Sequence, residues 1–299
     1  DWGYAYLAST NGSGKSVSLG DYYGMKESFV KNGTLATTKT KWTTRKEEDN
    51  PAMAYVHNLG SVSNSGKEGF MMLGYDDIYS IEYMYEKRMG YWKHDGKVTI
   101  FDAFEKLRDN YQAIMERCRA FDELIYDDAE KAGGKKYAEI CSASYRQVIS
   151  AHKLFTDKEG NLLWFSKENN SNGCVNTVDL TYPSAPLFLV YNPELQKAMM
   201  TSIFEYSASG RWNKPFPAHD LGTYPIANGQ VYGGDMPIEE GGNMVILAAA
   251  ISKIEGNADY VKKYWDFLTT WTNYLVEYGQ DPELSLIHIS EPTRLRCIS

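Results

Sequence analysis

Paired helical segments between residues 183 and 278 constrain the fold more than any other feature of the sequence. The segments 183–191 and 239–255 are apolar on every side, and the segments that follow them, 193–208 and 257–278, are amphipathic. A helix that is apolar all round is buried on every side, and short connections make neighbouring helices antiparallel. We therefore expect an inner ring of buried helices inside an outer ring of amphipathic ones, which is an α/α toroid.

One more helical pair is expected before these. Apolar residues from Phe101 to Ile125 recur at three-to-four spacing and predict a helix over 101–132, which two glycines end. A second helix over 135–155 follows as its antiparallel partner. The stretch TDKEGNLLWFS at 156–166 then predicts a small hairpin that turns at 159–161.

Residues 1–74 are predicted to be β. Short runs at 4–8, 35–42 and 53–62 are separated by clusters of Gly, Asn and Ser, which is typical of strands and turns. The fold class is therefore α+β and multidomain. We expect the C-terminal part of a β-sandwich at 1–74, followed by a partial α/α toroid at 75–283.

Both ends of the sequence indicate a fragment. The first residues, DWGYAYLAS, alternate like a strand and carry no starting methionine. The last sixteen, 284–299, read LSLIHISEPTRLRCIS, and the first eleven of these match a translated transposon-type sequencing adapter. We therefore expect 284–299 to be an artefact, as in a metagenomic fragment, and the natural chain to continue beyond residue 283.

Composition and motifs exclude several kinds of partner. The net charge of −8 and the pI of about 5.3 argue against binding to nucleic acid or to an anionic membrane. No apolar run approaches the roughly 20 residues of a membrane span. The sequence has no phosphate-binding loop, no G-x-S-x-G motif and no zinc spacing. We expect a small-molecule substrate, with no metal and no cofactor, while the oligomeric state is open.

The candidate site lies on two long loops, 156–182 and 210–238. Because the helices alternate in direction, both loops fall at the same end of the toroid, and each leads into the N-terminus of an inner helix. Carboxylates that share one cleft have pKa values that are pushed apart, which suits a general acid and a general base. The candidate catalytic residues are Asp179, Asp220, Glu239 and Glu240, and the candidate substrate-binding residues are His219, Tyr224, Tyr232, Asp235 and Trp212.

Ordinary structural roles are also open to these residues. Glu239 and Glu240 can be simple helix caps with no catalytic role. In the same way, Asp179 can be an ordinary turn residue and His219 a hydrogen-bonded loop histidine. The six glycines between 222 and 242 can serve turns, although their density indicates a close approach of backbone to a bound group. The residues by themselves therefore predict a carboxylate-lined cleft without assigning a role to each member.

The motif HDLGTYPIANGQVYGGDMPIEEGGNM at 219–244, with TVDLTYPSAPLFLVYNPEL before it and GYDDIYSIEYM at 74–84, resembles the central domain of the glutaminase A family. The resemblance covers about residues 75–283, and residues 1–74 are similar to the N-terminal sandwich domain of that family. It implies a six-hairpin, glycosidase-like (α/α)6 toroid. It also implies a secreted or periplasmic hydrolase that converts L-glutamine to glutamate and ammonia. About half of the toroid is then missing, so we expect the fragment itself to be inactive and poorly soluble.

Two other functions stay open at this point. A glycoside hydrolase would use the same toroid and paired acids, with carboxyl groups about 5–5.5 Å or 6.5–9.5 Å apart. A non-catalytic binding or scaffold module would instead have its cleft acids paired with cations, for which Arg211 and Lys214 lie nearby in the sequence.

Overall fold

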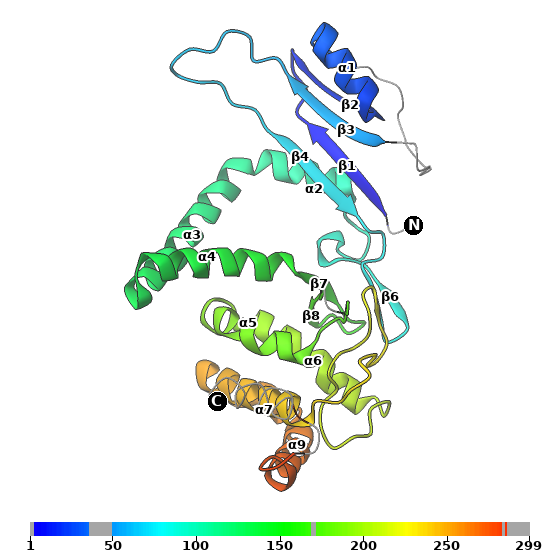
Figure 1. Cartoon of the computed structure of the whole chain (residues 1–299), viewed down its shortest axis with the longest axis vertical. Helices are drawn as coiled ribbons and strands as arrows, with labels where there is room; N and C mark the ends of the chain where they lie inside the picture. Colours follow the sequence, from blue (N-terminus) through cyan, green and yellow to red (C-terminus); the bar gives the residue numbers. More distant parts are fainter. Residues whose placement is uncertain (1–2, 36–49, 169–171, 283–284, 286–299) are drawn as a thin grey trace, which may run out of the picture. The chain divides into compact units, whose positions relative to one another are not determined.

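The computed structural model describes residues 3–35, 50–168, 172–282 and 285, and within them helices are mixed with short strands. Two compact units can be separated, one of residues 1–78 with 97–117 and one of residues 79–96 with 118–299 (Figure 1). In the described part of the chain, no helix is both long enough and apolar enough to cross a lipid bilayer. The expected mixture of helix and sheet is confirmed, whereas the predicted domain boundary near residue 75 stays a prediction.

The first unit contains two small antiparallel sheets. β1 (Tyr4–Ser9) pairs with β4 (Met71–Asp76), and β2 (Lys15–Asp21) pairs with β3 (Pro51–His57). The β-sandwich stays a prediction, because each of these sheets has only two strands among the described residues. The strand expected at 35–42 lies, apart from its first residue, outside the described residues.

A helix that the sequence did not predict follows β2 directly. In α1 (Tyr22–Asn32), Oδ2 of Asp21 accepts a hydrogen bond of 2.7 Å from the backbone N–H of Gly24 and caps the N-terminus. Gly33 closes the other end at φ 68°, a left-handed conformation that favours glycine. The expectation that residues 1–74 are β throughout is therefore wrong for this segment.

The long helix expected over 101–132 is two helices. α2 (Ile100–Asp109) begins with a capping box between Thr99 and Asp102, and α3 (Tyr111–Gly133) follows it. The break falls at Asn110, whose side-chain amide donates a 2.8 Å hydrogen bond to the carbonyl oxygen of Lys106. Asparagine competes in this way with the helical hydrogen-bond pattern, and the apolar spacing alone does not show such a break.

α4 (Lys135–Ser150) ends earlier than expected, because residues 152–156 form a strand. β7 (His152–Thr156) pairs antiparallel with β8 (Leu162–Ser166), with Leu154 opposite Trp164. The predicted hairpin is confirmed, and its turn includes Gly160 at φ 87°. The prediction of a helix over 135–155 is therefore wrong for residues 152–155. There, hydrogen bonds to β8 replace the helical ones.

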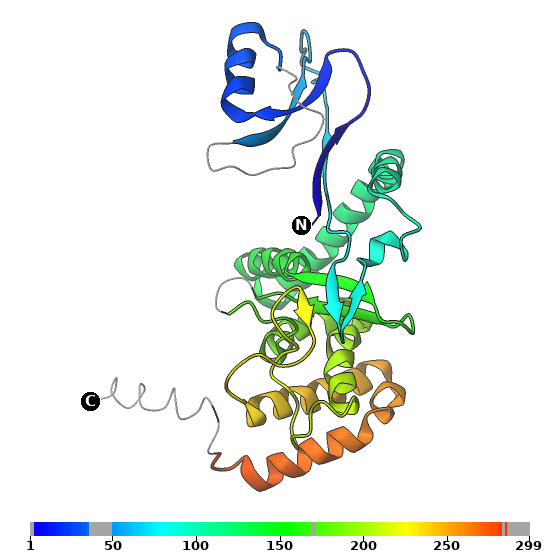
Figure 2. The ribbon, with the colours of Figure 1, turned by 90° about the vertical axis from the view of Figure 1, so that its right-hand side faces the viewer.

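A small three-stranded sheet connects distant parts of the second unit. β5 (Ile81–Tyr83) pairs antiparallel with β6 (Glu86–Arg88), which a short 3-10 helix (Tyr91–Lys93) follows, and pairs parallel with β9 (Ile226–Ala227). Figure 2 shows the yellow β9 segment beside the cyan strands. This pairing anchors the middle of the loop that carries most of the candidate site residues.

The helical pairs of the second unit are α5 (Val178–Tyr191) with α6 (Pro193–Ala208), and α7 (Pro237–Glu255) with the segments after it. α5 packs against both α6 and α7, and α9 packs against α7 (Figure 1). The last predicted helix, 257–278, is in fact α8 (Asp259–Lys262) and α9 (Trp265–Tyr278). As predicted, Asn192 caps α6 and Pro193 occupies its first turn.

α5 begins five residues before the predicted start at Pro183. Both Pro183 and Pro186 lie inside the helix, where a proline supplies no N–H to the backbone. The hydroxyl of Ser184, between the two prolines, lies 3.0 Å from the carbonyl oxygens of Leu180 and Thr181. The earlier start matters for the candidate site, because it places Asp179 in the first turn of α5.

The predicted order of burial between α5 and α6 is reversed. α6, expected on the outside, is the more enclosed helix, since it packs against β8, α5 and α7. α5 leaves Tyr182 and Val190 exposed. Amphipathicity shows which face of a helix is more apolar. It does not show how much of the whole helix is buried, because that depends on how many other elements pack against it.

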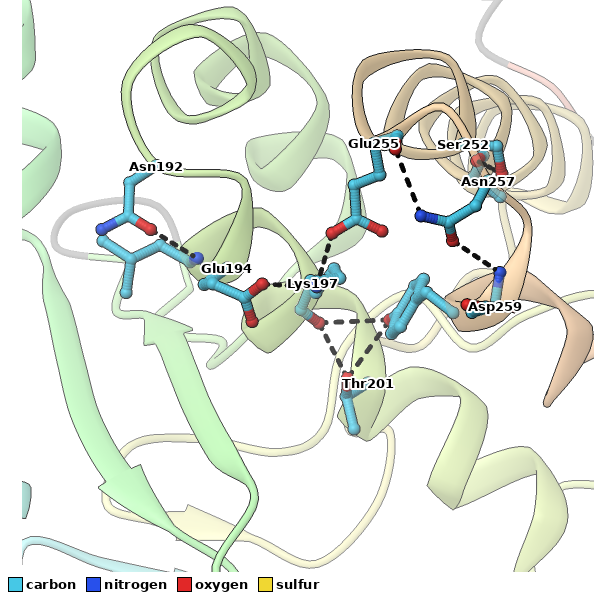
Figure 3. A network of polar contacts seen from close by, with 11 residues as sticks. Asn192, Glu194, Lys197, Thr201, Ser252, Glu255, Asn257 and Asp259 are labelled. Carbon is cyan, nitrogen blue, oxygen red and sulfur yellow. Dashed lines mark hydrogen bonds and ion pairs between the residues drawn. The ribbon is translucent and has the colours of Figure 1, made fainter.

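Aromatic rings and one cation hold these helices together. In the core of the second unit, the ring of Phe204 stacks on Tyr264 at 4.2 Å and on Trp271 at 5.1 Å. On α6, Nζ of Lys197 lies 2.6 Å from Oε1 of both Glu194 and Glu255, so that it joins α6 to the end of α7 (Figure 3). These contacts hold α6 against α9 and against the end of α7.

Candidate active site

The two long loops meet, as the sequence predicts. The N–H of Val175 donates to the carbonyl oxygen of Gly222 at 2.8 Å, and the N–H of Leu221 donates back to Val175 at 3.0 Å. The N–H of Val178, the first residue of α5, donates to the carbonyl oxygen of His219 at 3.0 Å. The second loop therefore sets the position of the α5 N-terminus.

Gly222 makes this close approach possible. Its φ is 140°, and a Cβ at this position would lie 2.1 Å from the carbonyl oxygen of Ile226. No side chain fits there without moving the backbone. Here the density of glycines that the sequence shows has a steric cause, because the chain turns tightly on itself beside the site.

Asp220 is completely buried and fully engaged. Its Oδ1 accepts from the N–H groups of Gly222 at 2.8 Å and Val231 at 3.0 Å, and its Oδ2 accepts from the N–H of Tyr232 at 3.1 Å. The segment 222–232 is thus wrapped around one carboxylate. These bonds occupy the oxygens of Asp220, so its main effect is to hold its neighbours in place.

His219 is one of those neighbours. Its Nδ1 lies 3.0 Å from Oδ2 of Asp220, an oxygen that also accepts from the N–H of Tyr232, so we take Nδ1 as the donor of this bond. The ring also stacks on Tyr232, with centroids 4.1 Å apart and planes 16° apart. The backbone N–H of His219 donates to Oε1 of Gln230 at 2.8 Å. This arrangement leaves Nε2 as the acceptor nitrogen of a ring held in one orientation.

Glu240, in the first turns of α7, is buried with no partner on either carboxyl oxygen. Burial raises the pKa of Glu240 to about 10, and the negative charges of Asp179, Glu239 and Asp220 raise it further in the same direction. At neutral pH this carboxyl group therefore carries a proton. It is therefore a buried proton donor.

Asp179 lies in the first turn of α5 and is partly buried. Its Oδ1 is a buried atom without a hydrogen-bond partner. Burial raises the pKa of Asp179, whereas the nearby His219 and the backbone N–H groups of Asp179 and Leu180 oppose that rise. One ring nitrogen of His219 and one carboxyl oxygen each of Asp179 and Glu240 all lie within 4.8 Å of one another.

The other predicted site residues have partners of their own. Asp235 forms an ion pair with Lys214 and accepts from Gln230 at 3.1 Å. Nε1 of Trp212 donates to the carbonyl oxygen of Phe216 at 2.5 Å. Lys167 lies over the ring of Tyr224, 5.2 Å from its centroid. Glu239 accepts a hydrogen bond from Ser285. The structure thus joins His219, Asp220 and Tyr232 by direct contacts and brings Asp179 and Glu240 close to His219.

Cys174 belongs to this neighbourhood, although the sequence gave no reason to include it. Its Sγ and one atom each of His219 and Asp220 lie within 4.8 Å of one another. Burial raises the pKa of the Cys174 thiol to about 12, and the charge of Asp220 adds to the effect. A thiolate is the nucleophilic form of cysteine, so this buried thiol is not a nucleophile at neutral pH. Only its position five residues before Asp179 could have indicated it.

Two sets of atoms have the composition of a metal site. One consists of Cys174, His219 and Asp220, and the other of Asp179, His219 and Glu240. In the first set the oxygens of Asp220 are already engaged by backbone N–H groups and His219. The expectation of no metal and no cofactor stays a prediction.

Comparison with known proteins gives matches over most of the chain. The family described as the glutaminase A six helical-hairpin domain matches residues 134–289, and a domain of unknown function (DUF5127) matches residues 1–128. The six-hairpin match supports a toroid-like architecture for the helical part. Apart from Ser285, the residues interpreted as adapter, 284–299, lie outside the described residues.

Two curated fungal proteins are similar to this chain. Glutaminase A of Aspergillus oryzae is 34% identical over 285 residues, which cover 93% of this chain and 41% of that protein. A protein of Arthroderma benhamiae named probable glutaminase is 36% identical over 127 residues, or 42% of this chain and 15% of that protein. The chain thus spans about two fifths of the length of the Aspergillus relative.

Proposed function

Because this chain belongs to the glutaminase A family, we propose that it is part of a hydrolase that converts L-glutamine to glutamate and ammonia. The observation that carries the proposal is Glu240, a fully buried carboxyl group with no partner. It lies beside the hydrogen-bonded pair of His219 and Asp220. A proton donor next to an oriented proton acceptor is what hydrolysis of an amide requires.

His219 acts as the general base in this proposal. Its Nε2 removes a proton from a water molecule while the water oxygen forms a bond to the amide carbon of the substrate. Asp220 accepts the hydrogen bond from Nδ1–H and stabilises the positive charge of the protonated ring. An orienting carboxylate has this role in a catalytic triad. The stacked ring of Tyr232 keeps the imidazole plane fixed during this transfer.

Glu240 acts as the general acid. Its proton goes to the amide nitrogen as the carbon–nitrogen bond breaks, and ammonia leaves. The proton taken up by His219 returns to the Glu240 carboxylate at the end of the cycle, so that one water and one amide give one carboxylic acid and one ammonia. Positioned proton transfer of this kind contributes about 10²–10⁴-fold to rate.

Membership of the glutaminase A family favours amide hydrolysis over the two alternative functions. The nearest oxygens of Asp179 and Glu240 lie within 4.8 Å, a limit that is compatible with carboxyl groups about 5–5.5 Å apart, so this distance does not separate amide from sugar chemistry. The paired acids that a scaffold module requires are found at Asp235, which binds Lys214. Among the described residues, no lysine or arginine forms an ion pair with Asp179 or Glu240.

The test is ammonia release from L-glutamine by the intact protein, beside a panel of aryl glycosides. We expect ammonia without glycoside cleavage, and a loss of at least about two decades in kcat for Glu240→Gln and for His219→Asn. Glu277→Gln, an exposed position on α9, is the matched control and should leave kcat unchanged. Glycoside cleavage without ammonia release would replace the proposal with sugar chemistry.

Location is a separate proposal that rests on the family alone. We propose that the protein is secreted or periplasmic, as the resemblance to the family implies. Fractionation of the source organism with an antibody against the intact protein tests this, and recovery only with the cytoplasmic fraction would contradict it.

A further inference from the structure

The candidate active site contains more negative groups than positive ones. Each of Asp179, Asp220 and Glu239 shifts the pKa of Glu240 upwards, and no cationic group opposes them. Nearby cations are engaged elsewhere: Lys214 binds Asp235, and the guanidinium of Arg211 lies 4.7 Å from the ring centroid of Tyr85. A proton neutralises Glu240, and Asp220 has its backbone donors. Asp179 is near His219 and two backbone N–H groups, but its Oδ1 has no hydrogen-bond partner and no lysine or arginine of the described residues forms an ion pair with it.

The surroundings of Asp179 also have unused hydrogen-bonding capacity. Oδ1 of Asp179 and Oγ1 of Thr177, two residues earlier, are buried atoms without partners in the described part of the chain. Thr177 occupies the N-cap position of α5, but its hydroxyl makes no capping bond. The fully buried Glu240, with both oxygens unpartnered, faces the same cluster. Leaving buried polar atoms of this kind unpaired costs free energy, and a bound group that hydrogen-bonds to them recovers that cost.

A charged amino group meets these requirements. An ammonium group has three N–H donors and no acceptor, so it can bond to a carboxylate oxygen and a hydroxyl oxygen at once. Its charge also offsets that of the carboxylate, which makes the hydrogen bond stronger than a neutral one. Neutral sugars and acylated amines offer weaker donors and no charge.

We propose that Asp179 binds the ammonium group of the substrate, so that the site selects amides that carry a free amino group. This inference rests on the proposed function, since it assigns the recognition of the same substrate. It separates two tasks within one cluster. Glu240 and His219 transfer protons at the amide, and Asp179 is the specificity-determining residue at the other end of the substrate.

The test compares L-glutamine with Nα-acetyl-L-glutamine, in which the ammonium group is replaced by a neutral amide. For the intact wild-type protein we expect kcat/KM for L-glutamine to exceed that for the acetylated compound by about 100-fold or more. In Asp179→Asn, KM for L-glutamine should rise at least about tenfold with a smaller change in kcat, because uniform binding is lost. The preference between the two compounds should then fall below about threefold. A merely structural role would lower both activities and leave the preference intact.

Asp266→Asn, an exposed acid in the first turn of α9, is the matched control and should keep the wild-type preference. Calorimetric titration of both compounds keeps the test decisive if no ammonia is released. One outcome is that no ammonia is released, yet L-glutamine binds more tightly than the acetylated compound and this preference depends on Asp179. That outcome would overturn the proposed function and support the ammonium site. Equal binding of the two compounds, or no detectable binding of L-glutamine, would overturn the ammonium site. Metal analysis that finds a divalent cation in the wild type and none in Asp179→Asn would also overturn it, because the carboxylate would already have its counter-charge.

Discussion

His219 and Asp220 are neighbours in the sequence and are hydrogen-bonded to each other, with Nδ1 of the ring 3.0 Å from Oδ2 of the carboxylate. Successive side chains of an extended chain point to opposite faces, so this contact needs a sharp local turn. The turn is fixed because Gly222, Val231 and Tyr232 direct their backbone N–H groups at the same carboxylate. The base and the group that orients it are thus built by one closed loop.

Asp220→Asn should remove the group that orients the His219 ring while keeping a side chain of nearly the same size. The amide oxygen can replace one carboxylate oxygen, but its NH2 group must face N–H donors, so the imidazole loses its acceptor. We expect kcat to fall by about two decades or more. The free energy of unfolding should fall by about 1–3 kcal/mol, since buried donors are left unsatisfied. Steady-state kinetics and urea unfolding measure the two effects, and an unchanged kcat would remove Asp220 from the mechanism.

Glu240→Gln should abolish a pH dependence of stability. The folded-state pKa of about 10 lies above the ordinary value of 4.5, so the folded protein binds the extra proton between these values. This contribution to stability is fully present below pH 4.5 and is lost as pH rises towards 10, by at most about 1.4 kcal/mol per pH unit. Glutamine mimics the protonated carboxyl group and does not titrate.

Urea unfolding of the two forms at pH 5, 7 and 9 measures this difference. We expect Glu240→Gln to be the more stable form at pH 9 and the two to converge towards pH 5. Parallel pH profiles for the two proteins would show that Glu240 is ionised in the folded state. The general-acid role would then fail as well.

His152 should make the fold sensitive to acid. Its ring stacks on Trp164 with centroids 5.0 Å apart, its Nδ1 donates to the carbonyl oxygen of Val148 at 2.6 Å, and its buried Nε2 has no partner. Burial lowers the pKa of His152 from 6.5 to about 4. Between these two pH values His152 is protonated in the unfolded chain and neutral in the folded protein. Stability is present above pH 6.5 and is lost as pH falls towards 4, by at most about 3 kcal/mol.

The variant His152→Phe keeps an aromatic ring against Trp164 and removes the titrating group. We expect its melting temperature to change less between pH 7 and pH 5 than that of the wild type. The carbonyl oxygen of Val148 keeps a second donor, the N–H of Ala151 at 3.2 Å, so the loss of one bond costs little at pH 7. If the melting temperatures of both proteins fall equally between pH 7 and pH 5, His152 is not the cause of the acid sensitivity.

Two glutamates that bind the same lysine allow a matched comparison of ion pairs. Glu194 and Glu255 both lie 2.6 Å from Nζ of Lys197, but the side chain of Glu194 is 67% exposed and that of Glu255 is 21% exposed (Figure 3). Water screens the exposed pair, so Glu194→Gln should change the free energy of unfolding by less than about 0.5 kcal/mol. Glu255→Gln should cost about 1–2 kcal/mol, because a partly buried charge-assisted bond is lost. Equal costs would mean that Lys197 does not join α6 to α7.

Local chemistry made several elements predictable. Asn192 and Pro193 mark the start of α6, because a side-chain acceptor followed by proline satisfies the first turn of a helix whatever surrounds it. The two loops were expected at one end of the helices because short connections force antiparallel neighbours. That reasoning needs only the helical period, and it brought Asp179 and Glu240 into one neighbourhood.

Other elements depended on partners that are distant in the sequence. Residues 152–155 continue a helical pattern, yet they form β7 because β8 supplies backbone hydrogen bonds. α6 has an amphipathic sequence but is more enclosed than α5 because β8, α5 and α7 pack against it. Period and capping give no information about such neighbours.

The sequence by itself determined that helices pair along residues 183–278, where α6 begins, and that four carboxylates lie near one end. Only the tertiary structure decided which of these acids differ chemically. Asp220 is engaged by three backbone N–H groups, whereas Glu240 is buried without a partner and keeps its proton. The physical reason is that the identity of a residue is local, but its pKa and its free hydrogen-bonding capacity depend on burial and on the charges that other segments bring close.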